Sequence, residues 1–425
     1  MRSYGYARNT TPFIDAYAKD GVLFSSLYCQ AIPTHPSFTS VYTGQYAITH
    51  GIVSHGGVRN LDRGTPVLPE ILQQNGYTTC AVDNLYRQKE WFARGYEFYI
   101  NPRLQGRLQQ TIPCEEYNAR AVPWLRSHAN EKFFLFVHYW DPHTPYLPPE
   151  GYRHLFYDGD PCDPKNRSLE PVWEHPYSKH LKGWFDQLMP GITDAEYIVA
   201  MYDGEIRYVD DRLRELLGTL EELGLVDDTL VVIFGDHGET MYKHRIYFDH
   251  HGLYDDVIHV PLIIKWPGAR QKGVRVSHLV QHVDVAPTIL DMVGIPLSDS
   301  MEGKSLVSYV NEKSGEPIYP FLVTEECTRM MKWGLRTDQY KYILSREQDY
   351  QGWPMRELYD LMSDPHEMKN IVEEYPDVAR KLEDMLEGWI TDMMKKNGLS
   401  TDPLIANGLT LAVGWSEWVK KHGYW

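Results

Sequence analysis

Short apolar runs alternate with helical patterns along most of the chain, and this alternation constrains the fold more than any other feature of the sequence. Residues 203–223 set Ile206, Val209 and Leu213 at three- and four-residue spacing, which is typical of a helix that covers a sheet. Apolar runs separated by such helices form mostly parallel sheets with helices on both faces. The sequence therefore predicts an α/β fold, an α/β/α sandwich, whose central sheet uses the runs at residues 22–27, 78–82, 133–139, 229–234 and 260–265.

The pattern changes at about Glu316, which predicts a second, smaller unit. Shorter strands at residues 321–325 and 333–344 precede a helical pattern at 376–394, as in a small antiparallel sheet with a helix packed on it. We therefore expect a catalytic α/β domain over residues 1–315 and a C-terminal α+β subdomain over 316–425. Residues 151–190 are rich in Pro, Asp, Trp and His without periodicity, which indicates an ordered loop over the edge of the sheet.

Charge and cysteine content limit the partners and the compartment. The 425 residues carry a formal net charge of −16, which argues against a nucleic-acid or anionic-membrane surface and favours a small-molecule or glycan substrate. No apolar run approaches the roughly 18 residues of a membrane span. Five irregularly spaced cysteines and the lack of an export signal at Met1 predict reduced thiols and a cytoplasmic protein. Tryptophans at helical spacing within residues 415–425 would suit packing against a neighbouring part of the protein or against a second subunit, so a homo-oligomer is one of two interpretations.

Histidine and aspartate side chains gather where the predicted strands end. Asp236 and His237 follow one apolar run, His138 and His143 lie at the end of another, and His250 precedes a third. Ligands bind at the carboxyl ends of strands in open parallel sheets, and a carboxylate with an imidazole can hold Zn²⁺ or Mn²⁺. Each pair could also be a hydrogen-bonded loop pair or a core residue. Their convergence from three strand ends favours a metal or catalytic site.

A hydroxyl group lies at the start of a short predicted helix over residues 33–44. Thr34, near the positive end of that helix, would be well placed to attack an anionic ester and to contact a metal ion. Thr34 and Ser37 could equally cap the helix, which is the commoner role of such residues. Their spacing does not choose between the two interpretations.

Taken in order, these segments resemble the signatures of the sulfatase family within the alkaline phosphatase superfamily. The likeness runs nearly end to end, and it implies an alkaline-phosphatase-like α/β/α sandwich with a small C-terminal subdomain. The segments that carry it are residues 4–15, Thr34-x-Pro36-Ser37 with Thr43-Gly44, Phe136 to Tyr146, Gly235-Asp236-His237-Gly238-Glu239, 283–288 and 357–370.

The sequence departs from the family pattern around the nucleophile. Family sulfatases carry a Cys or Ser, oxidised to formylglycine, where this chain has Thr34, and an Arg where it has Phe38. Threonine cannot give the aldehyde, because oxidation of its carbinol gives a ketone, so no formylglycine is expected. The family's lysine and histidine around that residue fall at Asn84 and Tyr86, and a later lysine falls near His250.

A metal-bound threonine nucleophile resembles the phosphodiesterase and phosphotransferase branches of the superfamily. By this resemblance Thr34 attacks phosphorus, while Asp236, His237 and Thr34 hold a divalent ion, Mn²⁺, Zn²⁺ or Ca²⁺. His143 or His250 would then protonate the leaving oxygen. The positions of Asn84, Tyr86 and His138 imply contacts with substrate.

The resemblance also predicts a gap in the sheet. Family members begin with a central strand that ends in metal-binding aspartates, about ten residues before the segment that begins here at Tyr4, and this chain has only Met1-Arg2-Ser3 there. We expect an unfilled central position, weakened metal binding and weakened activity. Metal titration of a version with the upstream codons restored would test this. The leading hypothesis is a metal-dependent hydrolase of phosphate (di)esters or phosphonate esters; the alternatives are a sulfuric ester hydrolase, a head-group phosphotransferase or an inactive truncated homologue.

Overall fold

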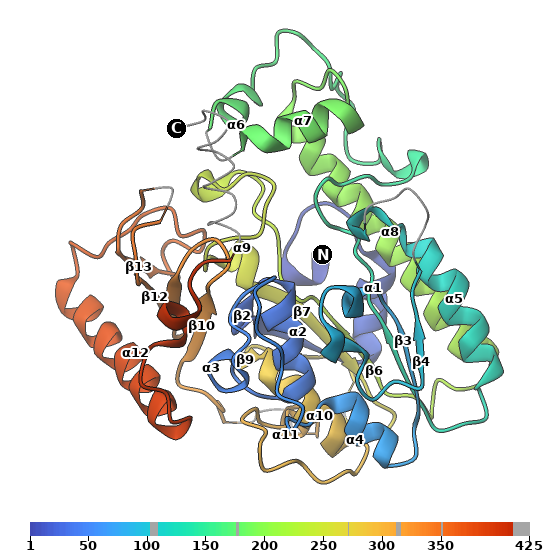
Figure 1. Ribbon diagram of the computed structural model, residues 1–425. Helices are drawn as coiled ribbons and strands as arrows, with labels where there is room; N and C mark the ends of the chain where they lie inside the picture. Colours follow the sequence, from blue (N-terminus) through green and yellow to red (C-terminus); the bar gives the residue numbers. More distant parts are fainter. Residues whose placement is uncertain (103–108, 176–177, 271, 312–315, 350–351, 411–425) are drawn as a thin grey trace.

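The computed structural model describes residues 1–425 except 103–108, 176–177, 271, 312–315, 350–351 and 411–425. At its centre lies a sheet in two parts (Figure 1). One part is ordered β4 (Phe98–Ile100), β3 (Thr78–Val82), β5 (Phe133–Val137). The other is ordered β6 (Val231–Phe234), β7 (His259–Lys265), β1 (Val22–Tyr28), β8 (Val274–Val276), with β9 (Val280–Gln281) also paired to β1.

The strand directions match the predicted, mostly parallel sheet. β3 pairs in parallel with β4 and β5, and β1 pairs in parallel with β8 and β9. β7 runs antiparallel to both β1 and β6. The reversal occurs because the chain turns back through residues 235–258, where the only α-helix is the four-residue α9 (Asp255–Ile258), instead of crossing over by a long helix.

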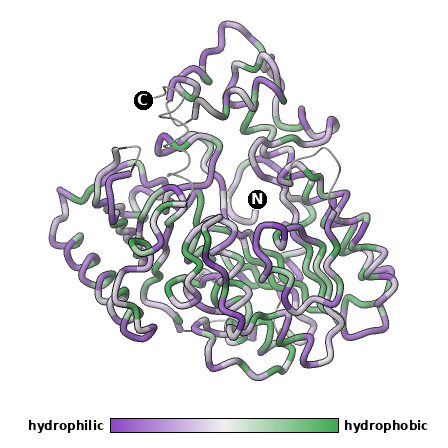
Figure 2. The backbone as a smooth tube through the Cα atoms, viewed as in Figure 1, coloured by the Kyte–Doolittle hydropathy of each residue, from purple (hydrophilic) through white to green (hydrophobic). Residues whose placement is uncertain are grey.

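Helices cover both faces of this sheet, as β5 illustrates. Phe133 and Leu135 pack in a cluster with Leu217 of α8, whereas Phe134 packs in a cluster with Leu72 of α4. The alternation follows from the two-residue period of a strand, and apolar segments accordingly run through the centre of the molecule in Figure 2. On the first face lie α1 (Pro12–Tyr17), α5 (Cys114–Ser127) and α8 (Ala195–Glu222); on the second lie α2 (Thr34–Thr43), α4 (Leu68–Gln74) and α10 (Val285–Met292).

The C-terminal subdomain is a second sheet with a helix on it. Its strand order is β13 (Arg356–Asp360), β12 (Tyr340–Ser345), β11 (Lys332–Arg336), β10 (Leu322–Glu326), β2 (Ala31–Ile32), and α12 (Pro376–Lys396) packs against it. The predicted strand at 333–344 is two strands, because the chain turns at residues 337–339. β2 comes from the N-terminal part of the chain and pairs with β10 directly before Thr34. The subdomain is therefore joined to the segment that carries the candidate nucleophile.

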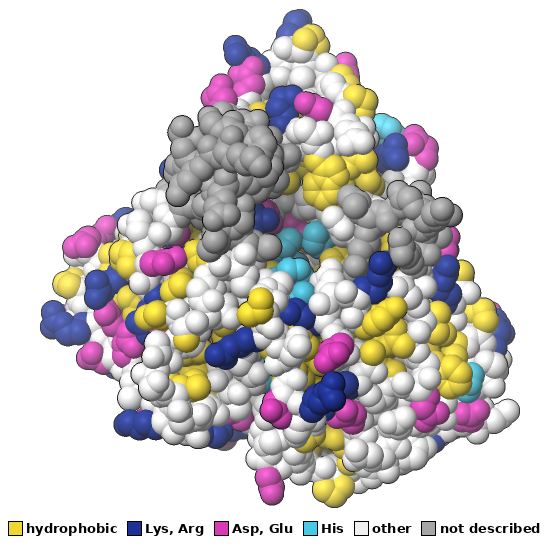
Figure 3. Space-filling model, viewed as in Figure 1, with side chains coloured by type: hydrophobic (Ala, Val, Ile, Leu, Met, Phe, Trp, Pro, Cys, Tyr) yellow, Lys and Arg dark blue, Asp and Glu magenta, His cyan; other side chains and the backbone are white. Residues whose placement is uncertain are grey.

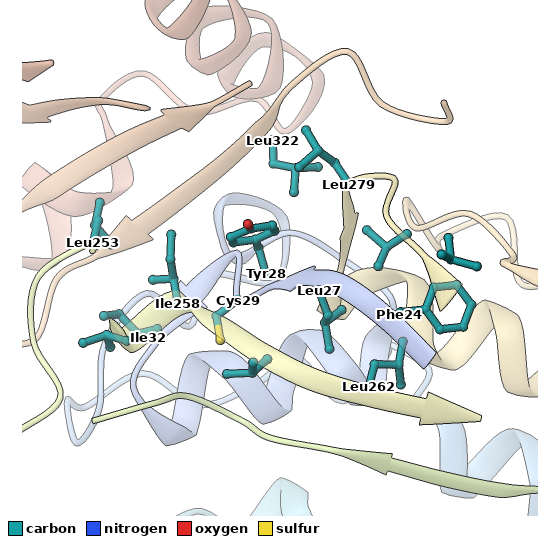
Figure 4. Close-up of a cluster of buried hydrophobic side chains, with 14 of the residues drawn as sticks. Phe24, Leu27, Tyr28, Cys29, Ile32, Leu253, Ile258, Leu262, Leu279 and Leu322 are labelled. Carbon is teal, nitrogen blue, oxygen red and sulfur yellow. The ribbon is translucent and has the colours of Figure 1, made fainter. Parts of the chain in front are cut away.

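A single apolar cluster ties the two sheets together (Figure 4). Phe24, Leu27 and Leu262 come from the central sheet, and Leu322 comes from the C-terminal one. All four side chains are nearly fully buried, so each contributes on the order of 1.5–3 kcal/mol of hydrophobic stabilisation. Further short helices are α3 (Ala47–His50), α11 (Val307–Asn311) and α13 (Pro403–Asn407).

The segment at residues 151–190 is ordered, but the prediction that it is wholly a loop is wrong. It contains α6 (Glu170–Glu174) and α7 (Lys179–Leu188). Leu181 and Phe185, one turn apart on α7, are buried in a cluster with Tyr197 of α8. This contact with a distant helix stabilises a segment whose own pattern is weak.

An open position interrupts the central sheet between β5 and β6. In the part of the chain that the structure describes, β5 pairs with β3 and β6 with β7, and neither strand pairs with the other. A cavity of about 1290 Å³ lies between them, lined by residues of both strands and by Phe38. Every residue of these two wholly apolar strands is only partly buried. The sequence predicted an unfilled central position, and the structure contains one.

No helix in the described ranges combines the length and the apolar character needed to cross a membrane. Residues 415–425, on which the expectation of a homo-oligomer rests, lie outside the described residues.

Candidate active site

Thr34 is the first residue of α2 and lies at the carboxyl-end edge of the central sheet. It is 3% exposed, and its Oγ1 lies 3.2 Å from Nε2 of His237. Nδ1 of His237 lies 3.0 Å from the carbonyl oxygen of Gly238. Because a carbonyl only accepts, Nδ1 carries the proton and Nε2 presents a lone pair to the Thr34 hydroxyl. The hydroxyl is thus held at the positive end of a ten-residue helix.

Asp236 directly follows β6 and lies beside the same imidazole. Its Oδ2 is 3.5 Å from Nε2 of His237. Burial alone would raise the pKa of Asp236, but the imidazoles of His237, His138 and His282 outweigh it and hold the pKa below its usual value. Asp236, His237 and Thr34, which the sequence predicted as metal ligands, are therefore brought together. One carboxylate oxygen, one imidazole nitrogen and one hydroxyl converge there.

The backbone that carries Asp236 is fixed by side chains that the sequence analysis did not assign. Ser37 donates from Oγ to the carbonyl oxygen of Asp236 at 2.7 Å, and Cys29 Sγ approaches the same oxygen at 3.0 Å. Nε2 of His282 lies 2.9 Å from the carbonyl oxygen of Gly235. The prediction had considered Ser37 only as a helix cap, whereas it positions Asp236.

His143 and His250 lie next to His237. The His250 ring stacks on the His237 ring with centroids 4.5 Å apart, and the His143 ring lies 5.1 Å from His250 and 6.5 Å from His237. Figure 3 shows histidine side chains gathered in a hollow on this face of the molecule. Burial, followed by the nearby His237, holds the pKa of His250 well below its usual value. The two predicted acid–base residues thus belong to one cluster of imidazoles with His237.

His138 lies at the end of β5 and is occupied by an internal partner. Its Nδ1 is 2.8 Å from Oδ1 of Asp83, a fully buried carboxylate at the end of β3. The ring lies edge-on to Phe38 at 4.7 Å. Asp83 immediately follows the run 78–82, so its place at a strand end was the available signal in the sequence. His138 lines the central cavity, and its role as a substrate contact stays a prediction.

The structure does not bring Asn84 and Tyr86 into this cluster. Asn84 is 1% exposed, accepts from Nε1 of Trp140 at 2.7 Å and donates to the Tyr117 hydroxyl at 3.3 Å. Its amide is therefore used inside the protein. Tyr86 is 43% exposed and packs edge-on against Tyr99 at 4.9 Å. The prediction that Asn84 and Tyr86 contact substrate stays a prediction.

Two acidic residues that the sequence analysis left unassigned complete the surroundings of His250. Glu239 Oε1 lies 3.4 Å and Asp249 Oδ1 lies 3.5 Å from Nδ1 of His250. Asp249 is also paired with His251 at 2.9 Å and with Arg329 at 3.3 Å. Among the described residues, His143, Glu239 and His250 form the one group of three whose ligand atoms all lie within 4.8 Å of each other.

Profiles of two families match the sequence. The family described as Sulfatase matches residues 1–295, and the family described as N-sulphoglucosamine sulphohydrolase, C-terminal, matches residues 243–392. The first match spans well over half of the chain and includes every residue of the cluster.

Individual relatives cover nearly the whole chain at low identity. Arylsulfatase K of Bos taurus is 28% identical over 429 residues, covering 89% of this chain and 77% of the relative. The N-acetylglucosamine-6-O-sulfatase of Bacteroides thetaiotaomicron is 23% identical, covering 91% of this chain and 83% of the relative.

Solved structures share the fold. The phosphonate monoester hydrolase of Agrobacterium radiobacter has a TM-score of 0.74 at 22% identity, covering 92% of this chain and 93% of that one. A protein solved with its substrate D-glucosamine-2-N,6-O-disulfate has a TM-score of 0.75 at 20% identity, covering 95% and 96%. At these identities the likeness establishes the architecture, including the C-terminal subdomain, but it does not establish which reaction this chain catalyses.

Proposed function

Since this chain belongs to the sulfatase family, and is therefore an ester hydrolase, we propose that it cleaves phosphate (di)esters or phosphonate esters with Thr34 as its nucleophile and a divalent metal ion as its cofactor. The observation that carries the proposal is the contact of 3.2 Å between Thr34 Oγ1 and His237 Nε2 at the start of α2. The first turn of a helix carries free N–H groups and partial positive charge, which favour an anionic ester. A hydroxyl fixed there faces the electrophilic centre of such an ester.

The donor atoms suit a divalent ion. Nε2 of His237 presents its lone pair toward Thr34 Oγ1, and its other nitrogen donates to the Gly238 carbonyl, as metal-bound imidazoles commonly do. Together with the Asp236 carboxylate this is an N,O set typical of Zn²⁺ or Mn²⁺, whereas Ca²⁺ prefers oxygen ligands alone. Bound there, such an ion would neutralise the nonbridging oxygens of the ester and favour ionisation of Thr34.

Phe38 supports a chemistry different from that of formylglycine. Its ring packs against Phe136 at 5.8 Å and Phe234 at 6.2 Å and is 4% exposed. An arginine at this position would place a guanidinium beside the nucleophile, whereas Phe38 supplies an apolar wall. With threonine as the nucleophile and no cation from this turn of α2, charge neutralisation would fall to a divalent ion held by Asp236 and His237.

The leaving oxygen needs its developing negative charge neutralised. His143 and His250 are the imidazoles next to His237, so either could donate a proton. Both rings stay candidates for the donor, and either would need a proton on the nitrogen that faces the leaving oxygen.

Sulfate esters are the second candidate class of substrate. Two relatives, Arylsulfatase K and N-acetylglucosamine-6-O-sulfatase, are named for sulfate chemistry, and the family bears that name. A sulfate monoester presents three nonbridging oxygens, where a phosphate diester presents two, and a divalent ion held by Asp236 and His237 could neutralise either, so the site would accept it.

Hydrolysis of matched chromogenic esters tests both candidates. A phosphate diester, a phosphate monoester, a phosphonate ester and a sulfate ester would be assayed with added Mn²⁺, Zn²⁺ or Ca²⁺. We expect metal-dependent cleavage of a phosphorus ester and a loss of at least ~10³-fold in Thr34→Ala, because the nucleophile is removed. The matched control is Thr43→Ala on the same helix, whose hydroxyl donates to the Thr39 carbonyl.

Retention of activity in Thr34→Ala would exclude threonine catalysis. Faster turnover of the sulfate than of every phosphorus ester, still dependent on Thr34, would favour the second candidate.

A further inference from the structure

His143, Glu239 and His250 come from three separate segments and converge beside the Asp236–His237 pair. His143 follows β5, Glu239 follows β6, and His250 precedes β7. One ligand atom from each lies within 4.8 Å of the other two. The ligands of a tetrahedral zinc ion lie about 3.4 Å apart, given bonds of ~2.0–2.1 Å, so side-chain shifts of about an ångström would close this group around an ion.

The atoms that face this point are poorly satisfied without an ion. Glu239 is 8% exposed, and its Oε1 lies 3.4 Å from Nδ1 of His250. Within the described part of the chain, neither of these two buried atoms has a hydrogen-bond partner. Buried polar groups are nearly always satisfied, so a carboxylate oxygen and an imidazole nitrogen left facing each other indicate a ligand that both would contact.

The atoms of Glu239 and His143 that face away from this point are held by hydrogen bonds, as in known metal sites. The Tyr146 hydroxyl donates to Oε2 of Glu239 at 2.7 Å, and the Thr144 hydroxyl lies 3.3 Å from the same oxygen. Nδ1 of His143 lies 2.7 Å from the Thr144 carbonyl oxygen, which leaves Nε2 as the lone-pair atom. Partners of this kind orient ligands and fix the tautomer of a ligating histidine.

We propose that His143, Glu239 and His250 form a second divalent-cation site, of the zinc type, next to the one formed by Asp236, His237 and Thr34. Two imidazoles and one carboxylate are a ligand set that leaves a coordination position open for substrate. The stacking of His250 on His237, at 4.5 Å between centroids, brings the two sites side by side. The inference rests on the proposed function: the second ion would take the place of a protonated imidazole in neutralising the leaving oxygen.

Metal content of the full chain tests this proposal without any substrate. The protein would be stripped with a chelator, equilibrated with Zn²⁺, freed of unbound ion and analysed for zinc per chain. We expect two equivalents in the wild type and one in Glu239→Gln, which keeps the shape of the side chain but removes its charge. Asp236→Asn should lose the other equivalent, and the exposed His154→Gln, the matched control, should keep both.

A subtler variant covers the case in which Glu239→Gln fails to fold. Tyr146→Phe removes only the hydroxyl that orients Glu239 and should weaken the affinity for the second ion about 10–100-fold, with the first ion unchanged. Cobalt substitution gives a second readout, because each site should contribute its own visible absorption: Glu239→Gln should lose one component and keep the other, and Asp236→Asn should show the reverse.

A wild-type content of one equivalent or none, or a content that neither Glu239→Gln nor Tyr146→Phe alters, overturns the second site. If the single ion depends on Asp236 and ester cleavage depends on Thr34, the proposed function stands without it. Two equivalents with no ester cleaved would support the second site and overturn the proposed function.

Discussion

Replacing Lys332 by methionine should strongly destabilise the protein, because the lysine is a buried cation between two buried carboxylates. Its Nζ lies 3.0 Å from Oδ2 of Asp349 and 3.0 Å from Oε1 of Glu357, and the three side chains are 1%, 1% and 2% exposed. Burial alone would lower the pKa of Lys332, but Glu357 and Asp349 outweigh it and raise the pKa. The Tyr254 hydroxyl also donates to Glu357 at 2.6 Å, so this network joins the C-terminal sheet to the catalytic domain.

The expected cost follows from what remains after the substitution. Methionine fills most of the space of the lysine stem, so the loss of packing is small and the main cost is two buried carboxylates without their cation. Removal of one partner from a buried ion pair costs about 3–5 kcal/mol in free energy of unfolding. The matched control, Lys395→Met, removes a pair whose members are 75% and 81% exposed, which is worth ~0–1 kcal/mol.

Urea unfolding at several pH values measures this cost and its origin. In Lys332→Met the penalty should be largest at neutral pH and should shrink as the pH falls, because acid removes uncompensated buried negative charge. Adding Asp349→Asn and Glu357→Gln should recover much of the loss. A Lys332→Met protein within ~1 kcal/mol of the wild type at pH 7, or a penalty that does not change with pH, would refute the reasoning.

Three further predictions concern other parts of the molecule. Gly388→Ala in α12, where an added Cβ meets nothing within 4 Å, should raise the free energy of unfolding in urea by up to ~1 kcal/mol. Gly238→Ala should destabilise the protein strongly, because its Cβ would lie 2.2 Å from the Asp256 carbonyl oxygen. Burial lowers the pKa of His50 to about 3 in the folded protein, so as the pH falls below 6.5 the imidazole is protonated in the unfolded protein before it is protonated in the folded one. The free energy of unfolding should therefore fall by ~1.4 kcal/mol per pH unit between these two values, and His50→Asn should flatten that slope. Ser37→Ala, which removes the donor to the Asp236 carbonyl, should weaken the affinity for the Asp236-dependent ion about 10-fold in a zinc titration; an unchanged affinity would show that Ser37 does not position Asp236.

Local patterns in the sequence were enough to locate the strands that position the site. The predicted run 78–82 is β3 residue for residue, and Asp236 and His237 follow β6 as expected. These predictions succeed because apolar runs and the turns that end them are properties of neighbouring residues. Short elements were missed for the opposite reason: β2 has two residues and exists through its pairing with β10, a contact across almost 300 positions of sequence.

Residue roles within the site were harder to predict, since they depend on which strand ends face each other. Asp83 was overlooked, although it follows a predicted strand, because its partner His138 is on another strand. Glu239 was part of a quoted motif but received no role, since only the fold brings it to His143 and His250. The hydrogen bond between Asn84 and Trp140 could likewise not be read from the sequence, because the two residues lie 56 positions apart.

The open position between β5 and β6 determines how stiffly the site is held. Asp236 and His237 extend from β6, whereas His138 and His143 extend from β5, and no backbone ladder joins these strands in the described part of the chain. Side-chain packing spans the gap between the strands themselves: Leu217 of α8 lies on one face, and on the other lies Phe38, whose ring meets Phe136 of one strand and Phe234 of the other. Beyond the strand ends, the Tyr146 hydroxyl donates to Glu239.

Side-chain contacts are non-directional and yield to shear more readily than a ladder of hydrogen bonds. The distance between the two strand ends therefore depends on side chains such as Phe38, and a change in the size of that ring would shift His138 and His143 relative to Asp236 and His237.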